Sequence, residues 1–410
     1  MLMARTLLAW QDGASCFICH GLGNGTQRTS IPHPATVCMT SEERHNARYL
    51  RRSQKRLEKR KKRFDAIGGL EGAFTYHDMF KDGKDCCKGV RWKHSVQNFE
   101  LHLFSATATA RAKVLTGRWE PQPYTKFTIC ERGKTRDIEA PKIRDRQVQK
   151  GITRRILLPL YTPCMIYNNG ASLKGKGLKF SQDRLKYELR QHYKKYGTAG
   201  KVMLLDFSKF FPTASHEIVR RNHRRVMFDE DIIRLCDTTL RSSGMPLGVE
   251  PSQAEMIYYP WALDCWLKCQ CGYRGMGHYM DDYYILLPTG EAPDGIFEKA
   301  KSIGLSVNKS KTALKPLSKP FRFCKIRYSI GERVKTVGGR EAYQRAKRKI
   351  NLFIKTRSPD WAESLNATIS YFNNYNDSLR KKRLFDCMAK EGICTMFVSG
   401  ASGGTQSAGM

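Results

Sequence analysis

Acidic residues are scarce in this sequence of 410 residues. Only 38 Asp and Glu stand against 72 Lys and Arg, which gives a formal net charge of +34. A charge excess of this size causes self-repulsion in a compact chain unless a polyanion offsets it. The composition therefore favours nucleic acid or an anionic membrane surface as a partner.

Long apolar runs are also absent. No stretch approaches the roughly 18 apolar residues of a membrane span, and the apolar run at residues 7–10 is too short for a signal peptide. Because nothing supports a membrane partner, we expect a nucleic-acid-binding protein in the cytoplasm. The glycine-rich stretch 168–177 lacks the Gly-Lys-Ser/Thr ending of a phosphate-binding loop, which excludes that class of nucleotide site.

A regular cysteine framework is missing as well, because the 14 cysteines are scattered along the chain. We expect reduced thiols. Within residues 1–40, which look loosely structured, Cys16, Cys19 and His20 resemble a haem-attachment string or half of a zinc site that His33 and Cys38 would complete. Haem attachment needs an exported protein, which nothing else supports, and we favour coincidence over zinc binding.

Positive charge is concentrated after Thr40. Residues 40–43 (Thr-Ser-Glu-Glu) form a capping-box start, and residues 44–63 hold eleven Lys or Arg against one acid, Glu58. This pattern predicts one long basic helix that binds RNA phosphates, and a solvated or disordered charged arm is the alternative. The residues expected to contact nucleic acid are Arg44, Arg48, Arg51, Arg52, Lys55, Arg56, Lys59 and Arg60.

The rest of the chain alternates between helical and strand patterns. Residues 64–115 carry apolar side chains at helical spacing, so 41–115 reads as a basic helical extension. We expect a helix from Asp145 that Pro159 and Pro163 interrupt, helices over 182–195 and 251–271, and a strand over 321–328. Two alternating runs around Gly133 predict a hairpin that carries Lys134 and Arg136 on one face. These two cations could bind one triphosphate, and an ordinary basic hairpin is the alternative.

Two acidic stretches predict a metal site. Residues 201–205 read as a buried strand that ends at Asp206, and residues 278–287 read as a hairpin with Asp281 and Asp282 at its turn. Carboxylates on neighbouring strands are hard oxygen donors that suit Mg²⁺ and two-metal nucleotidyl transfer. Taken singly, an Asp-Asp turn can be a solvated loop and Asp206 can be a helix cap.

The order and spacing of these motifs resemble the reverse-transcriptase family over roughly residues 125–330. The resemblance rests on several short segments, none of which is specific alone: Lys134-x-Arg136 with Pro141 and Asp145-Arg146; Leu205-Asp206 through Phe211; Gly248-x-x-x-Ser252-Gln253; Tyr279-Met280-Asp281-Asp282; and Asn308-x-x-Lys311-Thr312.

The resemblance implies an α/β (α+β) right-hand polymerase whose palm is an antiparallel sheet flanked by helices. The implied domains are fingers at 116–200, palm at 201–330 and a helical thumb at 331–395, followed by a Gly/Ser-rich tail at 396–410. The part after residue 340 is too short for a thumb plus an RNase H or integrase domain.

The resemblance also implies roles for individual residues. Asp206, Asp281 and Asp282, with the backbone carbonyl of Phe207, would bind two Mg²⁺ ions, for which Mn²⁺ can substitute. Lys311 would complete the catalytic set as a general acid toward pyrophosphate. The nucleotide-binding residues would be Lys134, Arg136, Phe211, Leu247, Gly248 and Gln253, with Phe211 favouring dNTPs over rNTPs. Core packing is the alternative for Phe211, and a solvated surface lysine is the alternative for Lys311.

The implied activity is copying RNA into cDNA with dNTPs. The Ser252-Gln253 pair and Leu247 are similar to bacterial and phage enzymes of diversity-generating retroelements and of antiphage-defence systems, which would place the protein in a bacterial or phage-infected cell. A dedicated structured RNA is the expected partner, and an accessory protein or a second copy is a further candidate. Two alternatives stay open: template-independent or protein-primed DNA synthesis, and a maturase-like RNA-binding protein without polymerase activity.

Overall fold

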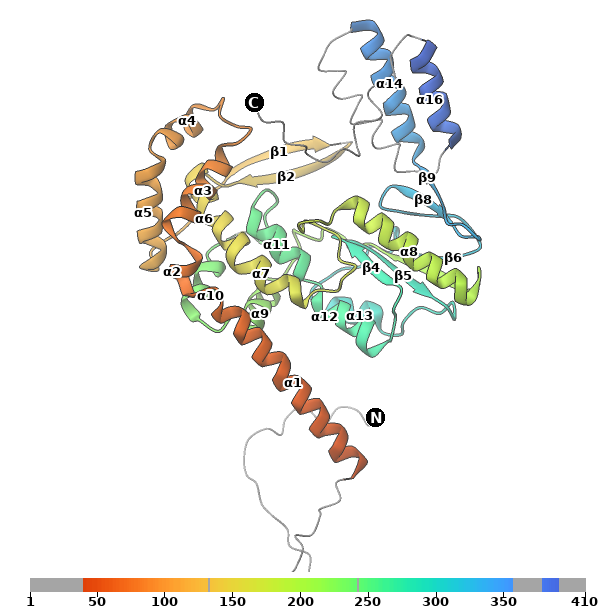
Figure 1. Cartoon of the computed structure of the whole chain (residues 1–410), viewed down its shortest axis with the longest axis horizontal. Helices are drawn as coiled ribbons and strands as arrows, with labels where there is room; N and C mark the ends of the chain where they lie inside the picture. Colours follow the sequence, from red (N-terminus) through yellow and green to blue (C-terminus); the bar gives the residue numbers. More distant parts are fainter. Residues whose placement is uncertain (1–39, 132, 242, 357–377, 391–410) are drawn as a thin grey trace, which may run out of the picture. The chain divides into compact units, whose positions relative to one another are not determined.

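The computed structural model describes residues 40–131, 133–241, 243–356 and 378–390 (Figure 1). The chain divides into two compact units, residues 1–55 and 56–410. The cysteines and histidines at positions 16, 19, 20, 33 and 38, and the tail at 396–410, lie outside the described residues. Helices and antiparallel strands both contribute, which agrees with the expected α/β (α+β) class. Within the part of the chain that the structure describes, no helix is long and apolar enough to cross a membrane.

The basic segment forms one helix, α1 (Ser41–Asp65), as its sequence predicts. Its capping box is present: the Thr40 amide donates to Glu43 Oε2 at 2.7 Å, and the Glu43 amide donates to Thr40 Oγ1 at 3.2 Å. These bonds satisfy amides that a helix start leaves without partners. The helical region that follows is also as expected, with helices α2 (Gly69–Ala73), α3 (Tyr76–Cys87), α4 (His94–Leu101) and α5 (Leu103–Leu115).

The predicted basic hairpin is β1 (Thr125–Glu131) and β2 (Lys134–Ala140), paired in antiparallel register. The helical stretch after it differs from the expectation at Pro159. It continues through α6 (Ile143–Gly151), the π-helical segment η1 (Ile152–Leu157), α7 (Leu158–Tyr161) and the 3₁₀ turn η2 (Thr162–Cys164). Pro159 does not interrupt it: the backbone stays helical through Leu157 and Leu158, and the proline lies just after the π-helical segment η1, where the regular hydrogen-bond pattern has already changed.

The central sheet has four antiparallel strands in the order β4-β5-β3-β6. Alternating side chains of its middle strands enter two different cores. Val202, Tyr284 and Leu286 pack with residues of α8 on one face, and Met203 and Ile285 pack with the helices on the other. Figure 1 shows α8 along one face of this sheet. The strands are β3 (Lys201–Leu205), β4 (Met276–Tyr279), β5 (Asp282–Leu287) and β6 (Ala313–Pro316).

Helices surround this sheet, and one expected helix is broken. The predicted helix over 251–271 is divided at Tyr259 and Pro260, since proline inside a helix removes a backbone hydrogen bond. The elements are α8 (Leu178–Tyr196), α9 (His216–Val226), α10 (Glu230–Asp237), α11 (Glu250–Tyr258), α12 (Trp261–Cys265), the π-helical segment η3 (Trp266–Gln270) and α13 (Ile296–Ser302).

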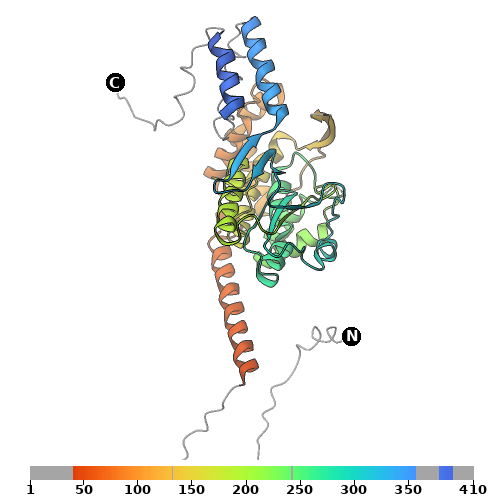
Figure 2. The ribbon, with the colours of Figure 1, turned by 90° about the vertical axis from the view of Figure 1, so that its right-hand side faces the viewer.

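The segment expected as one strand over 321–328 is a hairpin. Cys324 and Lys325 both have positive φ, 46° and 69°, and this reverses the chain between β7 and β8. The three-stranded sheet consists of β7 (Phe321–Phe323), β8 (Ile326–Ser329) and β9 (Lys335–Gly338). Two helices, α14 (Arg340–Thr356) and α16 (Ser378–Lys390), follow and lie side by side in both views (Figures 1 and 2).

A buried histidine links the helices α9, α10 and α11. His223 Nδ1 lies 2.8 Å from Asp237 Oδ1, and Nε2 lies 3.2 Å from Glu255 Oε1. Burial opposes the charged imidazolium, but the hydrogen bonds to Asp237 and Glu255 outweigh it and raise the pKa of His223 from 6.5 to about 8.

This raised pKa predicts a pH-dependent stability. Because the folded state holds the His223 proton more tightly than the unfolded chain, the stabilisation is complete below pH 6.5 and is lost as pH rises through about 8. We expect the free energy of unfolding to fall by about 1 to 2 kcal/mol across this window. Urea denaturation on either side of it measures the change. The variant His223→Gln should lose this pH dependence, and an unchanged pH profile in that variant would contradict the assignment.

Candidate active site

Asp206 is held at the end of β3 by backbone pairing with the segment 306–308. Its carbonyl accepts a hydrogen bond from the Asn308 amide at 2.8 Å, and the Ser208 amide donates to the Ser306 carbonyl at 2.8 Å. The side chain is buried, with 8% of the residue exposed. A carboxylate at the end of a central strand, fixed on both sides, is rigidly positioned.

The other two carboxylates lie in the turn between β4 and β5. Tyr279 pairs with Asp282, so Met280 and Asp281 are the two turn residues. Met280 has a φ of 54°, the left-handed conformation that such tight hairpin turns require. Since β5 pairs directly with β3, with Leu205 opposite Tyr283, this turn and Asp206 lie at the same end of adjacent strands. The sequence-based expectation of carboxylates on neighbouring strands is therefore correct in geometry.

The three carboxylates affect one another electrostatically. Burial, followed by the charges of Asp281 and Asp206, raises the pKa of Asp282 to about 6. Burial, followed by the charge of Asp206, also raises the pKa of Asp281. Lys311 and Lys134 act in the opposite direction on both groups. Crowded negative charge of this kind is relieved by a proton or by a cation.

Lys311 supplies positive charge at this point. Its Nζ lies 2.9 Å and 3.0 Å from the two carboxylate oxygens of Asp206. The hydrogen bond to Asp206, together with the charges of all three aspartates, raises the pKa of Lys311. Lys311 is paired with Asp206, but its side chain is 53% exposed, and its role as a general acid stays a prediction beside the alternative of a solvated surface lysine.

A cavity of about 220 Å³ opens beside the carboxylates, and Asp206, Asp282 and Lys311 line it. Arg322 and Lys325 of the β7–β8 hairpin line the same cavity. Sequence reasoning missed these two cations, because the segment looked like a single strand rather than a hairpin. Their charge gives this part of the cavity wall a preference for anionic ligands.

The predicted nucleotide-binding residues fall in two places. Lys134 and Arg136 are exposed on β2, and Lys134 is near enough to act on the pKa of Asp281 and Asp282. Gly248 and Gln253 line a second cavity of about 160 Å³ together with Arg146 and Gln149. The Leu247 carbonyl accepts a hydrogen bond from the Glu139 amide at 2.8 Å, which ties the β1–β2 hairpin to the loop before α11.

Phe207 and Phe211 lie after Asp206. Phe207 is buried, with its ring edge-on to Tyr283 at 5.6 Å, so its side chain is a core residue. Phe211 is half-buried, and its ring contacts Phe210 edge-on at 5.9 Å. A partly exposed ring five residues after Asp206 is compatible with contact to a sugar, and the roles assigned to Phe211 and to the Phe207 carbonyl stay predictions.

Gly248 allows the close approach of this loop to the hairpin. It has a φ of 105°, and a Cβ atom there would lie 2.9 Å from Ile138 Cγ2 and 3.0 Å from the Glu139 carbonyl. Gly175 also has positive φ, 73°, but a Cβ atom at that position would meet no other atom within 4 Å. Gly175 therefore serves as a control for backbone strain alone.

These two positions give a prediction for alanine substitutions. We expect Gly175→Ala to lower the free energy of unfolding by about 1 kcal/mol through strain. Gly248→Ala adds a backbone clash and should lower it by about 2 to 4 kcal/mol. Denaturant unfolding of both variants measures the difference. Equal losses would show that the contact between the loop and the hairpin does not depend on glycine.

The eight cations expected to bind nucleic acid all lie on α1. All are exposed except Arg60, which is half-buried. The residues up to Lys55 belong to the first compact unit, and Arg56, Lys59 and Arg60 belong to the second. Their contact with nucleic acid stays a prediction.

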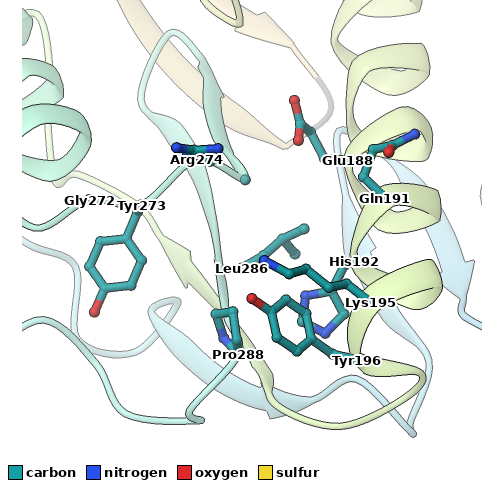
Figure 3. A pocket seen from close by; sticks show the side chains of 11 residues that line it. Glu188, Gln191, His192, Lys195, Tyr196, Gly272, Tyr273, Arg274, Leu286 and Pro288 are labelled. Carbon is teal, nitrogen blue, oxygen red and sulfur yellow. The ribbon is translucent and has the colours of Figure 1, made fainter.

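A larger cavity, about 490 Å³, lies away from the carboxylates between α8 and the loop before β4 (Figure 3). Lys195 and Arg274 bring positive charge to it, and Tyr196 contributes an aromatic ring. Glu188 also lines it but already accepts hydrogen bonds from Asn168 and Arg184. This mixed lining favours no single class of ligand.

The donor atoms of the three aspartates suit a divalent ion of the Mg²⁺ type, which prefers carboxylate oxygens. Across the described ranges, however, no three His, Cys, Asp or Glu side chains are grouped closely enough to hold a metal ion by themselves. Mg²⁺ usually keeps water and substrate phosphates among its ligands, so one or two carboxylates are sufficient protein donors. In this conformation the cation bound by Asp206 is the Lys311 ammonium group.

Comparisons with known proteins include a distant structural likeness. No family model matches the chain, and no curated protein matches it. Among solved structures, the chain is similar to the telomerase from Candida albicans in complex with the TWJ fragment of telomeric RNA, with a TM-score of 0.39 and 9% sequence identity. The alignment covers 70% of this chain and 58% of the telomerase chain, less than two thirds of that protein's length. The likeness is too distant to assign a family.

Proposed function

We propose that this protein is an RNA-directed DNA polymerase that extends a 3′-hydroxyl with dNTPs. The observation that carries the proposal is the meeting of Asp206 with the Asp281-Asp282 turn at one end of the paired strands β3 and β5, with Lys311 on Asp206. Rigid backbone presents hard oxygen donors next to a cation at this point. Nucleotidyl transfer needs carboxylates to hold a metal ion and a basic side chain nearby. The metal and the basic side chain stabilise the negative charge that develops on the phosphates.

In this proposal the β3–β6 sheet is the palm of a right-hand polymerase. The β1–β2 hairpin with its following helices serves as fingers, and α14 with α16 serves as a thumb. The support is the arrangement of the sheet, with one core on each face, and the order of the elements along the chain. The expected boundaries at residues 116 and 201 lie between these elements, whereas the one at 331 lies between the paired strands β8 and β9 and would divide the three-stranded sheet.

The residues of the site would hold two Mg²⁺ ions, with Asp206, Asp281 and Asp282 as ligands. Bound Mg²⁺ would activate the attacking hydroxyl and stabilise the leaving pyrophosphate. Asp206 is free to accept another cation only when the Lys311 ammonium leaves it. Lys311 would then lie close to the reacting phosphates, and because a lysine is protonated at neutral pH even without its contact to Asp206, it would serve as the proton donor.

The dNTP would be held by the hairpin and by the loop before α11. Lys134 and Arg136 share one face of β2 and offer two cations to the triphosphate. The Leu247–Glu139 bond keeps this hairpin beside Gly248 and Gln253. Phe211 would pack against the sugar and disfavour rNTPs.

The template would be RNA, and a structured noncoding RNA is the partner that the charge of +34 and the basic α1 suit best. The Ser252-Gln253 pair suggests a role in a diversity-generating retroelement or in antiphage defence. A dedicated RNA would be the template in either role. Both roles place the protein in the cytoplasm of a bacterial or phage-infected cell.

The test is the incorporation of labelled dNTPs by the purified protein with Mg²⁺, with and without a primed RNA template. Incorporation that requires the RNA supports the proposal. Equal incorporation without template would indicate template-independent or protein-primed synthesis instead. RNA binding without any incorporation would indicate a maturase-like binding protein.

A further inference from the structure

A buried side-chain pair lies directly behind the Asp281-Asp282 turn. His278, on β4, has a fully buried side chain, and the Asp264 side chain on α12 is only 3% exposed. His278 Nε2 lies 3.2 Å from Asp264 Oδ2. On the other side of the ring, Nδ1 lies 3.2 Å from the backbone carbonyl oxygen of Met280. The imidazole therefore bridges a helix and the turn itself.

Tyr283 completes this arrangement from the next strand. Its hydroxyl donates to Asp264 Oδ1 at 2.9 Å. Its ring stacks on the His278 ring, with centroids 4.4 Å apart and an interplanar angle of 6°. The stacking fixes the plane of the imidazole, and the carboxylate fixes its rotation within that plane. Nδ1 is thus aimed at the Met280 carbonyl by contacts from two separate elements.

The contacted peptide is the strained part of the turn. Met280 has a φ of 54°, and the left-handed conformation is unfavourable for a residue with a side chain. Such a residue keeps this conformation when its surroundings determine it. A carbonyl and a carboxylate can both only accept hydrogen bonds, so His278 must donate to Met280 through Nδ1–H and to Asp264 through Nε2–H. By holding the ring in place, Asp264 keeps this Nδ1–H donor directed at the Met280 carbonyl.

We propose that His278 and Asp264 are positioning residues for the carboxylates of Asp281 and Asp282. His278 binds the Met280 carbonyl, Asp264 orients His278, and the turn is thereby held in the conformation that presents both carboxylates toward Asp206. The catalytic consequence rests on the proposed polymerase function, whereas the effect on the turn does not. Neither residue is placed close enough to reacting groups to be catalytic itself.

Simple core packing does not account for this pair. Burying a charge is costly, and apolar residues of similar shape would fill the same space at no such cost. Another buried histidine, His223, has a carboxylate at each ring nitrogen, Asp237 and Glu255, and does not contact the turn. It provides a control for burial and for residue type.

The first variant removes the hydrogen bonds and keeps the packing. In Asp264→Leu/His278→Phe/Tyr283→Phe every polar member of the group is replaced by an apolar side chain of similar shape, which limits the loss of stability. We expect kcat for dNTP incorporation on primed RNA to fall about 10- to 100-fold, because a turn displaced by about 1 Å misplaces both carboxylates. The KM for dNTP should change less than about threefold, since the triphosphate contacts lie elsewhere.

The second readout needs no activity. Amide hydrogen exchange in a peptide spanning residues 276–287 should become about tenfold faster in the triple variant and stay unchanged in peptides from α9 to α11. Asp264→Asn is the conservative variant. Its amide can donate to Nε2 while Nδ1–H still donates to the Met280 carbonyl, so kcat and exchange should stay near wild type.

Each outcome decides the proposal. Faster exchange at the turn with rescue by Asp264→Asn supports it, even if the wild-type protein incorporates no dNTP and the polymerase assignment therefore fails. Unchanged exchange at the turn overturns it, whatever happens to kcat. An equal loss of kcat in His223→Gln also overturns it, because general loosening of the core would then explain the effect. If the triple variant does not fold, Asp264→Ala against Asp264→Asn makes the same comparison.

Discussion

Replacing Asp206 by Asn is expected to reduce RNA-templated dNTP incorporation by about 10³-fold or more. The neutral amide cannot share a divalent cation with Asp281 and Asp282, and it no longer attracts the Lys311 ammonium group. Single-turnover incorporation on a primed RNA template measures the loss in the chemical step. Asp183→Asn is the matched control, since Asp183 on α8 also forms an ion pair with a lysine, Lys179, but lies outside the carboxylate cavity.

The same substitution should leave the protein folded. Asp206 adds to the negative charge that raises the pKa of Asp281 and Asp282, so its removal relieves repulsion between buried carboxylates. We therefore expect no loss in the free energy of unfolding, and only a small fall in the pKa of Asp282 from about 6, because burial and the charge of Asp281, the two larger causes, remain. An Asp206→Asn protein that keeps more than about a tenth of wild-type activity would show that the carboxylate group is not the reaction site.

Neutralising α1 is expected to weaken RNA binding more than any other surface change. In the variant, Gln replaces all eight cations that we expect to contact phosphate: Arg44, Arg48, Arg51, Arg52, Lys55, Arg56, Lys59 and Arg60. Gln keeps a good helix propensity. Because RNA binding then releases fewer counterions for each phosphate contact that is lost, affinity should fall about 10³-fold or more near physiological salt. The slope of log affinity against log salt should become shallower by up to about seven.

Fluorescence anisotropy with a labelled structured RNA, repeated at several salt concentrations, measures both quantities. A control variant carries Lys in place of the six arginines of this set, which keeps the charge and should keep most of the affinity. Unchanged affinity and slope in the glutamine variant would place the RNA interface on another part of the chain.

The sequence predicted those parts of the site that depend on local pattern. The strand ending at Asp206 is a short continuous apolar run, and the turn at Asp281 and Asp282 and the hairpin with Lys134 have alternating patterns or turn residues within about ten residues. The capping box at Thr40 is equally local. No sequence pattern predicts that β3 and β5 are neighbours. We expected it because Asp206 and Asp281 together suggested a metal site.

Other features depended on backbone geometry or on distant contacts and were missed. Cys324 and Lys325 have positive φ without being glycine, so nothing marked the hairpin that brings Arg322 and Lys325 to the cavity. Pro159 looked like a helix breaker but follows the π-helical segment η1 within a continuous helical stretch. His278 and Asp264 are 14 residues apart on a strand and a helix, and neither carries a local signal of their contact.

The most direct test of the central assignment is the choice of nucleotide on a template of one base. With a poly(rA) template, an oligo(dT) primer and Mg²⁺, we predict that the purified protein incorporates dTTP and rejects the other three dNTPs. The same reaction should be absent in the Asp281→Ala/Asp282→Ala double variant. Incorporation of all four dNTPs regardless of template, or activity that survives the double variant, would contradict an RNA-directed polymerase with these carboxylates at its centre.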